Sequence, residues 1–389
     1  MNLHALSAAE RPLRILLIST GLRMGGAEQQ IAALAREFIA RGNQVALISL
    51  TPDCEVPMPD AVERLMLDMR KTPVSMAQAL AAARRFASRW QPDIVNSHMF
   101  HANMFARVLA RVASLPPLIC AAHSFSEGGR LRMTLYRLTN RWCTVTTQVS
   151  ETSRAEMIRA GAVTSDRIRV MYNGIDTVKF QPDALLRDQT RTQLGLDAQT
   201  RMVLNIGRLA AEKAQVALID AFARMDRSTP TRLFIAGDGP QRPALEARIA
   251  QHRLQDQVML LGTRHDVQAL LNAADLFALS SRIEGMPLVI GEALACGCPV
   301  VATSAPGVAE LLGDIGAMVQ VGDTDALARA MLRALTTEDR ASDQRRIGRE
   351  HIVTRFGIAA AADRWLALYH ELSDPARGHA GHVHPCAGA

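Results

Sequence analysis

Two acidic and two basic residues in the second half of the sequence have types and spacings suited to chemistry. Glu284 and Glu292 enclose a Gly-Met-Pro turn and the start of an apolar segment in EGMPLVIGEALA, and Arg208 and Lys213 lie in GRLAAEKAQ, directly after an apolar run. A carboxylate accepts hydrogen bonds from hydroxyl groups such as those of a sugar ring or a ribose diol. An arginine fork together with a lysine point charge neutralises a diphosphate.

The turn between the two glutamates predicts a helix start that is suited to an anion. Pro287 is well placed at the first helical position, because its missing N–H would be unpaired there. The amides of Leu288 and Val289 are then free donors at the positive end of a helix dipole, which favours a phosphate. Glu292 would lie about 7 Å further along the helix axis. The alternative is structural: Glu284 caps the helix and Glu292 finds a surface partner.

The elements that must position these residues alternate regularly along the chain. Apolar runs of strand length are separated by segments with apolar residues at helical spacing, and most of the runs are continuous and rich in β-branched residues, as in strands buried on both faces of a parallel sheet. The predicted strands are 14–19, 44–49, 93–98, 117–123, 143–150 and 168–173 in the first half, and 202–207, 232–237, 257–262, 274–280, 299–303 and 317–321 in the second. This pattern predicts an α/β fold with two doubly wound parallel sheets.

We place the domain boundary in the turn-rich segment YNGIDTVKFQPD. The expected organisation is an N-terminal Rossmann-like domain that binds the acceptor, a C-terminal Rossmann-like domain that binds the donor, a helix that packs back on the N-terminal domain, and a disordered tail. Their expected ranges are 1–180, 181–356, 357–373 and 374–389.

Five motifs together resemble glycosyltransferase family 4, the retaining nucleotide-sugar glycosyltransferases of GT-B fold. The resemblance covers most of the chain. It is carried by STGLRMGGAEQQ, MYNGIDTVKF, GRLAAEK, FIAGDGP and EGMPLVIGEALACGCPVVAT. It implies a GT-B fold, in which two Rossmann-like domains face a cleft. Ala214 departs from the family pattern, in which Gly or Asn is common after the lysine.

The resemblance also implies roles for particular residues. In the second domain, Arg208 and Lys213 would grip the donor diphosphate, Glu284 the sugar hydroxyls and Glu292 the ribose. The amides of Leu288 and Val289 would bind phosphate. The remaining glycines implied in donor binding are Gly25, Gly26 and Gly237.

Three histidines in the first half follow predicted strands. His123 ends PLICAAH, and His98 and His101 lie in DIVNSHMFHAN. A histidine at a strand end is often an ordinary hydrogen-bonded residue. The family commonly has a histidine where His123 lies, near the sugar and the leaving phosphate, so we expect a catalytic role for His123. His98 and His101 are weaker candidates for contact with acceptor or sugar.

No metal or other cofactor is expected. The motif Asp323-Thr-Asp325 precedes a helical segment, so we interpret one of its aspartates as an N-cap rather than a metal ligand. The six cysteines are scattered without CxxC spacing, which is typical of a reducing compartment, and Cys296 and Cys298 are expected to be small core residues. The N-terminus does not resemble a signal peptide. We therefore expect a cytoplasmic protein.

The charge distribution suggests partners. Residues 1–180 contain 22 Lys and Arg against 14 Asp and Glu, with basic clusters in RRFASRW and GRLRMTLYRLTNRW. One interpretation is a solvated helix face, and the other is attraction to an anionic membrane surface or acceptor. Nucleic acid is not expected, because aromatic residues make up only 4% of the chain.

The functional hypothesis is a retaining, metal-independent transferase. It would move a hexose or N-acetylhexosamine from a nucleotide-diphosphate sugar, with UDP as the expected nucleotide, to an acceptor hydroxyl. The expected acceptor is a lipid-linked saccharide of envelope polysaccharide or lipopolysaccharide. The alternatives are a UDP-sugar 2-epimerase of GT-B fold and a non-catalytic nucleotide-sugar-binding scaffold.

Overall fold

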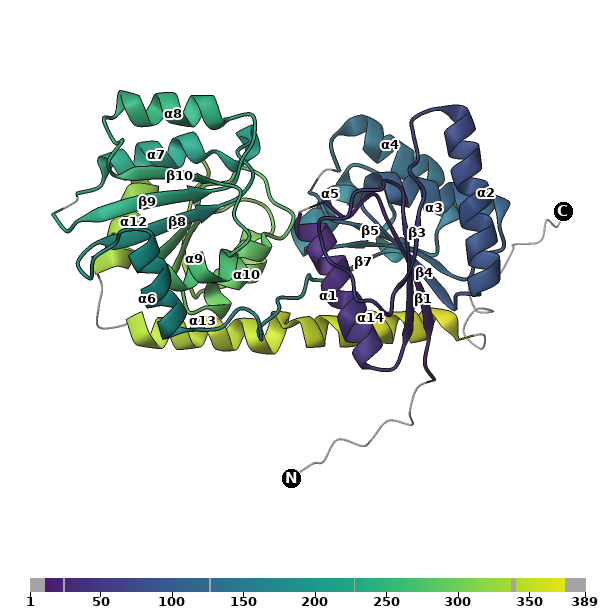
Figure 1. Ribbon diagram of the computed structural model, residues 1–389. Coiled ribbons are helices and arrows are strands. Elements are labelled where there is room, and N and C mark those ends of the chain that lie inside the picture. The colour runs from purple at the N-terminus through teal and green to yellow at the C-terminus, as the bar shows by residue number, and fades with distance from the viewer. Residues whose placement is uncertain (1–10, 24, 126, 227, 337–340, 375–389) are drawn as a thin grey trace. The chain divides into compact units, whose positions relative to one another are not determined.

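The computed structural model describes residues 11–374 apart from residues 24, 126, 227 and 337–340 (Figure 1). The chain divides into two compact units. Unit 1 comprises the described residues of Met1–Val149, Arg154–Gly174 and Ala359–Ala389, and unit 2 those of Ser150–Ser153 and Ile175–Ile358. Apart from the short segment Ser150–Ser153, the chain enters unit 2 at Ile175. The observed boundary therefore follows Gly174, six residues before the expected one. The expected disordered tail lies outside the described residues from residue 375 onward.

Unit 1 contains a parallel sheet of seven strands in the order β3-β2-β1-β4-β5-β6-β7. Its strands are β1 (Arg14–Ser19), β2 (Gln44–Ser49), β3 (Glu63–Met66), β4 (Ile94–His98), β5 (Leu118–Ala122), β6 (Val145–Gln148) and β7 (Ile168–Val170). Six of these were predicted from the sequence, and β3 was missed. Strand β3 is four residues long, lies at the sheet edge and has no fully buried residue, so it lacks the apolar run by which the others were found.

Helices flank the sheet of unit 1 (Figure 1). Leu16 and Ile18 of β1 point to the face that α2 and α3 cover, where they share a core with Phe86 and Phe105. The helices of this unit are α1 (Gly26–Ala40), α2 (Pro73–Trp90), α3 (Phe100–Val112), α4 (Arg130–Thr139), α5 (Glu151–Arg159), which begins in unit 2, and α14 (Ile358–Ser373).

Helix α14 joins unit 1 from the far end of the sequence. Its Tyr369 is fully buried and its hydroxyl oxygen accepts a hydrogen bond from Asn96 Nδ2 at 2.6 Å. Glu371 accepts two hydrogen bonds of 2.6 Å from the guanidinium of Arg169. This bidentate ion pair and the buried tyrosine fix the helix on the unit that the first half of the chain forms.

Unit 2 contains a second parallel sheet, in the order β10-β9-β8-β11-β12-β13. Its strands are β8 (Arg201–Ile206), β9 (Thr231–Ala236), β10 (Val258–Gly262), β11 (Leu276–Leu279), β12 (Val300–Thr303) and β13 (Ala317–Val319). Its helices are α6 (Ala184–Gln193), α7 (Gln215–Arg224), α8 (Arg242–Gln251), α9 (Val267–Ala273), α10 (Leu288–Ala295), α11 (Val308–Leu312), α12 (Thr324–Thr336) and α13 (Ala341–Phe356). All six strands predicted for this half are present, so the prediction of two doubly wound parallel sheets is confirmed.

Three smaller predictions are tested by unit 2. Cys296 and Cys298 are buried, as expected for small core residues. Asp323 caps α12, because its Oδ1 accepts a hydrogen bond from the amide of Ala326 at 2.8 Å. The prediction for Pro287 was wrong by one position: it is the N-cap of α10, with extended backbone (ψ 98°), and the helix begins at Leu288.

Candidate functional site

The loop after β8 carries Arg208 and Lys213 at the carboxyl edge of the second sheet. A short 3₁₀ turn, Ala211–Lys213, leads into α7 through Ala214. Ala214 has left-handed backbone (φ 51°, ψ 35°), which is costly for a residue with a Cβ. This conformation explains why glycine or asparagine suits that position.

Lys213 and Glu284 meet although they come from different loops. Lys213 Nζ lies 2.6 Å from Glu284 Oε1, and Glu284 is 8% exposed. Two further hydrogen bonds join the same loops: the amide of Arg282 donates to the carbonyl of Glu212 at 2.7 Å, and Ser280 Oγ donates to the carbonyl of Lys213 at 2.9 Å. The loop after β11 and the loop after β8 are therefore built as one structure.

Arg208 is the most exposed of the predicted site residues on these loops. Its side chain is 68% exposed and pairs with Glu212 at 2.5 Å. Its carbonyl accepts a hydrogen bond from Nε2 of the buried Gln215 at 3.0 Å. The backbone of Arg208 is thus fixed while its guanidinium lies at the surface, where it is available to an anion.

The amides at the start of α10 are free donors. Pro287 gives the helix no side-chain cap, and we find no acceptor for the amides of Leu288 and Val289 in the part of unit 2 that the structure describes. One turn along the helix, Glu292 is half-buried, and burial raises the pKa of its carboxyl to about 7 while Lys179 opposes the shift. A phosphate at this helix end would gain from the dipole and the amides.

The glycine turn after β9 packs directly on the loop after β8. Gly237 has φ 135°, and a Cβ at this position would lie 2.0 Å from the carbonyl oxygen of Gly207. The backbone carbonyl of Asp238 accepts a hydrogen bond from the amide of Leu209 at 2.9 Å. The role of Gly237 that the structure shows is therefore to let two backbone segments approach.

In unit 1, the glycine loop leads into α1. Gly25 is the N-cap, with extended backbone and no side-chain hydrogen bond at the cap, and Gly26 is the first residue of the helix. A Cβ on Gly25 would lie 2.5 Å from Oε2 of Glu28. Both predicted glycines are thus at a helix N-terminus.

His98 and His123 lie together, and His101 lies apart from them. Nδ1 of His98 is 3.0 Å from Nε2 of His123. His98 is 1% exposed, whereas His101 lies on the exposed side of α3 with its ring against Phe100. Burial lowers the pKa of His123 to about 4 and that of His98 well below its usual value.

Glu127 is a site residue that the sequence did not reveal. It is buried, and its Oε1 accepts hydrogen bonds from the amides of His123 at 3.1 Å and Ser124 at 2.9 Å. Burial raises the pKa of this carboxyl. A single glutamate in a glycine-rich loop gives no pattern, so sequence reasoning had no signal for it.

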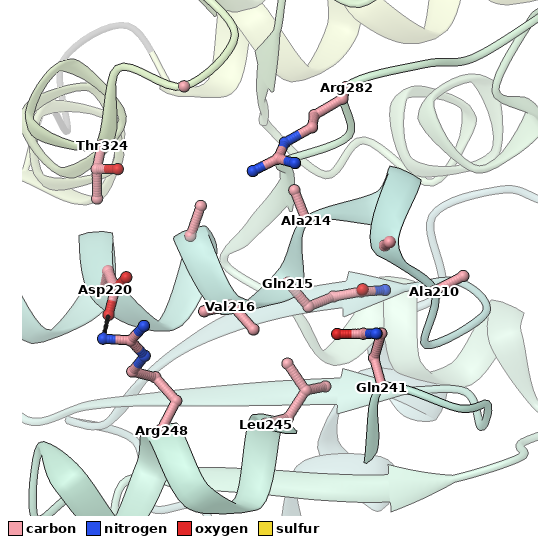
Figure 2. A pocket seen from close by; sticks show the side chains of 13 residues that line it. Ala210, Ala214, Gln215, Val216, Asp220, Gln241, Leu245, Arg248, Arg282 and Thr324 are labelled. Carbon is pink, nitrogen blue, oxygen red and sulfur yellow. Dashed lines mark ion pairs between the residues drawn. The ribbon is translucent and has the colours of Figure 1, made fainter. Parts of the chain in front are cut away.

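A surface pocket of about 390 Å³ lies beside the loop after β8 (Figure 2). Residues of α7, α8 and the segment before α12 line it, and Arg282 points into it above α7. Asp220 and Arg248 form an ion pair at 3.5 Å on one wall. Ala210 and Ala211 of the loop after β8 line the pocket, whereas Lys213, Glu284 and Glu292 are not among its lining residues.

The described residues were also compared with the requirements of a metal site and of a membrane-spanning helix. Within the ranges that the structure describes, no group of three or more His, Cys, Asp or Glu side chains is arranged to hold a metal ion. None of the described helices combines the length and apolar character required to cross a bilayer.

Two doubly wound α/β units, each with its own parallel sheet, are the architecture of the GT-B class. The comparisons with known proteins give the family. Residues 24–179 match Glycosyltransferase Family 4 and residues 187–351 match Glycosyl transferases group 1, so the two matches together span most of the chain. The chain belongs to glycosyltransferase family 4.

Among its relatives is the N-acetyl-alpha-D-glucosaminyl L-malate synthase of Bacillus anthracis, which is 27% identical over 53% of this chain and 54% of that enzyme. The chain thus spans about half the length of this relative. The UDP-Gal:alpha-D-GlcNAc-diphosphoundecaprenol alpha-1,3-galactosyltransferase of Escherichia coli is 27% identical over 75% of this chain and 79% of that enzyme.

The fold is shared with the crystal structure of Anabaena Alr3699/HepE in complex with UDP and glucose. The TM-score is 0.81 at 22% identity, and the match covers 92% of this chain and all of that one. The prediction of a GT-B fold is confirmed.

Proposed function

We propose that the protein is a retaining glycosyltransferase that moves a hexose or N-acetylhexosamine from a nucleotide-diphosphate sugar to an acceptor hydroxyl. The observation that carries this proposal is the arrangement at the edge of the second sheet. There the Lys213–Glu284 pair and the surface guanidinium of Arg208 share one sheet edge with the uncapped start of α10. Membership of family 4 and the relatives reported above favour transfer over the isomerase alternative.

In the proposed mechanism, the bond between the sugar C1 and the leaving diphosphate breaks and a bond from the acceptor oxygen to C1 forms on the same face. The acceptor's proton passes to the leaving phosphate. Negative charge grows on the diphosphate, and Arg208, Lys213 and the amides of Leu288 and Val289 would stabilise it where it develops. Glu284 is held by Lys213, and we assign it to the sugar hydroxyls rather than to a nucleophilic role, in contrast to the paired acids of retaining glycosidases.

We propose UDP as the donor nucleotide and a lipid-linked saccharide of envelope polysaccharide or lipopolysaccharide as the acceptor. The support is the Escherichia coli relative, whose name gives a UDP-sugar donor and a diphosphoundecaprenol acceptor. Glu292 is the residue proposed for the ribose.

A donor screen followed by product analysis tests the function. Thermal shift with UDP-, GDP- and ADP-sugars identifies the nucleotide, and mass spectrometry on lipid-diphosphate acceptors identifies the product. Retention requires that the anomeric proton of the product show the donor's configuration by NMR. Formation of an epimer from UDP-N-acetylglucosamine without acceptor would replace the transferase proposal with the isomerase.

Metal independence is proposed because two cationic side chains and a helix N-terminus already supply positive charge for a diphosphate. Turnover is expected to survive excess EDTA unchanged. A loss that Mg²⁺ or Mn²⁺ reverses would refute this part of the proposal.

We also propose that α4 attaches the protein to an anionic membrane surface on the cytoplasmic side. Leu131, Leu135 and Leu138 are 75%, 36% and 62% exposed, and their spacing places them on one helix face. The flanking Arg130 and Arg137 are cationic, and α4 contains no acidic residue.

The opposite face of α4 is the one that packs on unit 1. Met133 and Tyr136 are its buried residues, and the hydroxyl of Tyr136 accepts a hydrogen bond from Asn103 Nδ2 at 2.7 Å. The exposed leucines are therefore not needed for the core. An exposed apolar stripe with arginines beside it is the composition of a helix that lies in a lipid interface.

Vesicle sedimentation tests the membrane contact. The wild type is expected to bind vesicles that contain phosphatidylglycerol, and to bind pure phosphatidylcholine at least about tenfold more weakly. The double substitution Leu131→Ser and Leu138→Ser should abolish binding. Leu185→Ser is the matched control, because Leu185 is 68% exposed on α6. Equal binding by all three proteins would refute the role of α4.

A further inference from the structure

We infer that His98 is a positioning residue that holds His123 as a neutral hydrogen-bond donor, with the His123 proton on Nδ1. The two residues end neighbouring strands: His98 is the last residue of β4 and His123 follows β5 directly. Nδ1 of His98 and Nε2 of His123 are 3.0 Å apart, within hydrogen-bond distance. The importance of this arrangement for catalysis rests on the function proposed above, whereas the arrangement itself does not.

The two rings share one hydrogen-bonding proton. His98 is 1% exposed. Its ring centroid lies 5.3 Å from that of His123 and 6.2 Å from that of Trp365. Burial lowers the pKa of both imidazoles, that of His123 to about 4. Both rings are therefore neutral near pH 7, and a neutral imidazole carries its proton on one nitrogen alone.

The surroundings of His98 decide which ring donates. Its Nε2 is buried and has no hydrogen-bond partner among the residues that the structure describes. A proton on this Nε2 would be a buried N–H without an acceptor, and such orphaned donors are rare in proteins. The proton of His98 is therefore on Nδ1, which donates to Nε2 of His123. Since Nε2 of His123 accepts, the proton of His123 is on Nδ1.

The backbone of His123 is held from the other side. Oε1 of Glu127 accepts hydrogen bonds from the amides of His123 and Ser124, as described above. Oε2 of Glu127 accepts a longer one from the hydroxyl of Tyr136, at 3.4 Å. Glu127 itself has φ 47°, a strained conformation for a residue with a side chain. The ring and the backbone of His123 are thus both fixed before any substrate binds, which is how catalytic groups are preorganised.

The chemical consequence concerns the role of His123. Its Nε2 lone pair is used by His98, so this nitrogen is not free to act as a general base. The Nδ1–H is a neutral donor, suited to a sugar hydroxyl or a phosphate oxygen. His123 would then orient the substrate rather than remove the acceptor's proton, in agreement with a mechanism in which the leaving phosphate takes that proton.

NMR of the full-length protein with ¹⁵N-labelled histidine tests the tautomer directly. We expect the His123 ring to show a protonated Nδ1 and an unprotonated Nε2 at pH 7.5, with His98 also protonated on Nδ1. Spectra of His123→Gln and His98→Asn assign the two rings. A protonated Nε2 on His123 would overturn the inference, whether or not the protein transfers sugar.

Kinetics then test positioning. His98→Phe keeps a planar ring but removes the hydrogen bond, whereas His98→Asn retains an N–H near the position of Nδ1. We expect His98→Phe to lower kcat by about 10- to 100-fold with the donor KM within about threefold, as for small misplacements of a reacting group. His98→Asn should recover most of kcat. The control is His252→Gln, which should leave kcat unchanged, because His252 follows α8 in unit 2 and its Nε2 contacts Asp220 at 2.7 Å.

The outcomes separate the two proposals. Equal kcat for His98→Phe, His98→Asn and the wild type would refute the positioning role. If the wild type transfers no sugar to any acceptor, the proposed function fails, and the NMR result alone decides the state of the histidine pair. Circular dichroism and the melting temperature show whether His98→Phe is folded. If it is not, the NMR spectrum of the wild type remains the deciding measurement.

Discussion

Replacement of Lys213 by methionine separates the electrostatic role of this residue from its packing. Methionine keeps an unbranched apolar chain of similar length, so the packing of the lysine stem is largely retained. The ammonium group is lost, and with it the 2.6 Å contact to Glu284. Glu284, 8% exposed, then has a buried charge without its partner.

Two effects of different size follow. Removal of one group that stabilises developing charge typically lowers kcat by about 10²- to 10³-fold, equivalent to about 3–4 kcal/mol. Breaking a fully buried ion pair costs about 3–5 kcal/mol of stability. Lys213 is 25% exposed, so water reaches the pair, and we expect the loss in free energy of unfolding to be nearer about 2 kcal/mol.

A double-mutant cycle with Glu284→Gln distinguishes the two effects. Urea unfolding should show that Lys213→Met together with Glu284→Gln recovers at least about half of the stability lost by Lys213→Met alone, because the neutral amide has no uncompensated charge. The kcat with the preferred donor should stay low in the double variant. The reasoning is refuted if Lys213→Met keeps kcat within about threefold of the wild type, or if stability and kcat recover together.

Three further predictions follow from the structure. Ala214→Gly removes the steric strain of a Cβ in left-handed backbone, so the free energy of unfolding should stay the same or rise by up to about 1 kcal/mol. Ala217→Gly, inside α7, should instead lower the free energy of unfolding by about 1 kcal/mol. Equal losses in urea unfolding would contradict this. Burial raises the pKa of Glu292 to about 7, so its protonated form favours the fold, and this contribution is fully present below pH 4.5 and lost as pH rises through 7. Glu292→Gln should therefore gain stability relative to the wild type between pH 5 and pH 8, by up to about 3 kcal/mol. A difference in urea midpoint between Glu292→Gln and the wild type that stays constant from pH 5 to pH 8 would contradict the raised pKa of Glu292. Gly237→Ala should cost more than about 3 kcal/mol, because a Cβ there meets a backbone carbonyl, while Gly42→Ala, at φ 82° with open space around it, should cost about 1 kcal/mol. Similar melting temperatures for the two variants would refute the clash.

The central strands of both units were predictable from local pattern, because strands buried on both faces require continuous apolar runs. Strand β3 was not, since a half-exposed edge strand of four residues carries no such run. The cap at Asp323 was also readable, because an aspartate before a helical segment has few other local uses. The start of α10 was displaced by one residue, because Pro287 has extended backbone (ψ 98°) and the helical conformation begins only at Leu288.

The amino-acid sequence by itself determined the two-sheet architecture and the identities of the charged residues, since these depend on hydrophobic period and on motifs within about 20 residues. Only the tertiary structure decided their partners. The contact of Lys213 with Glu284 spans 71 positions, the pairing of His98 with His123 joins two strands, and the support of His123 by Glu127 depends on burial. A side chain's partner and its pKa are set by distance and by removal from water, and both arise from the folding of segments that are remote in the sequence.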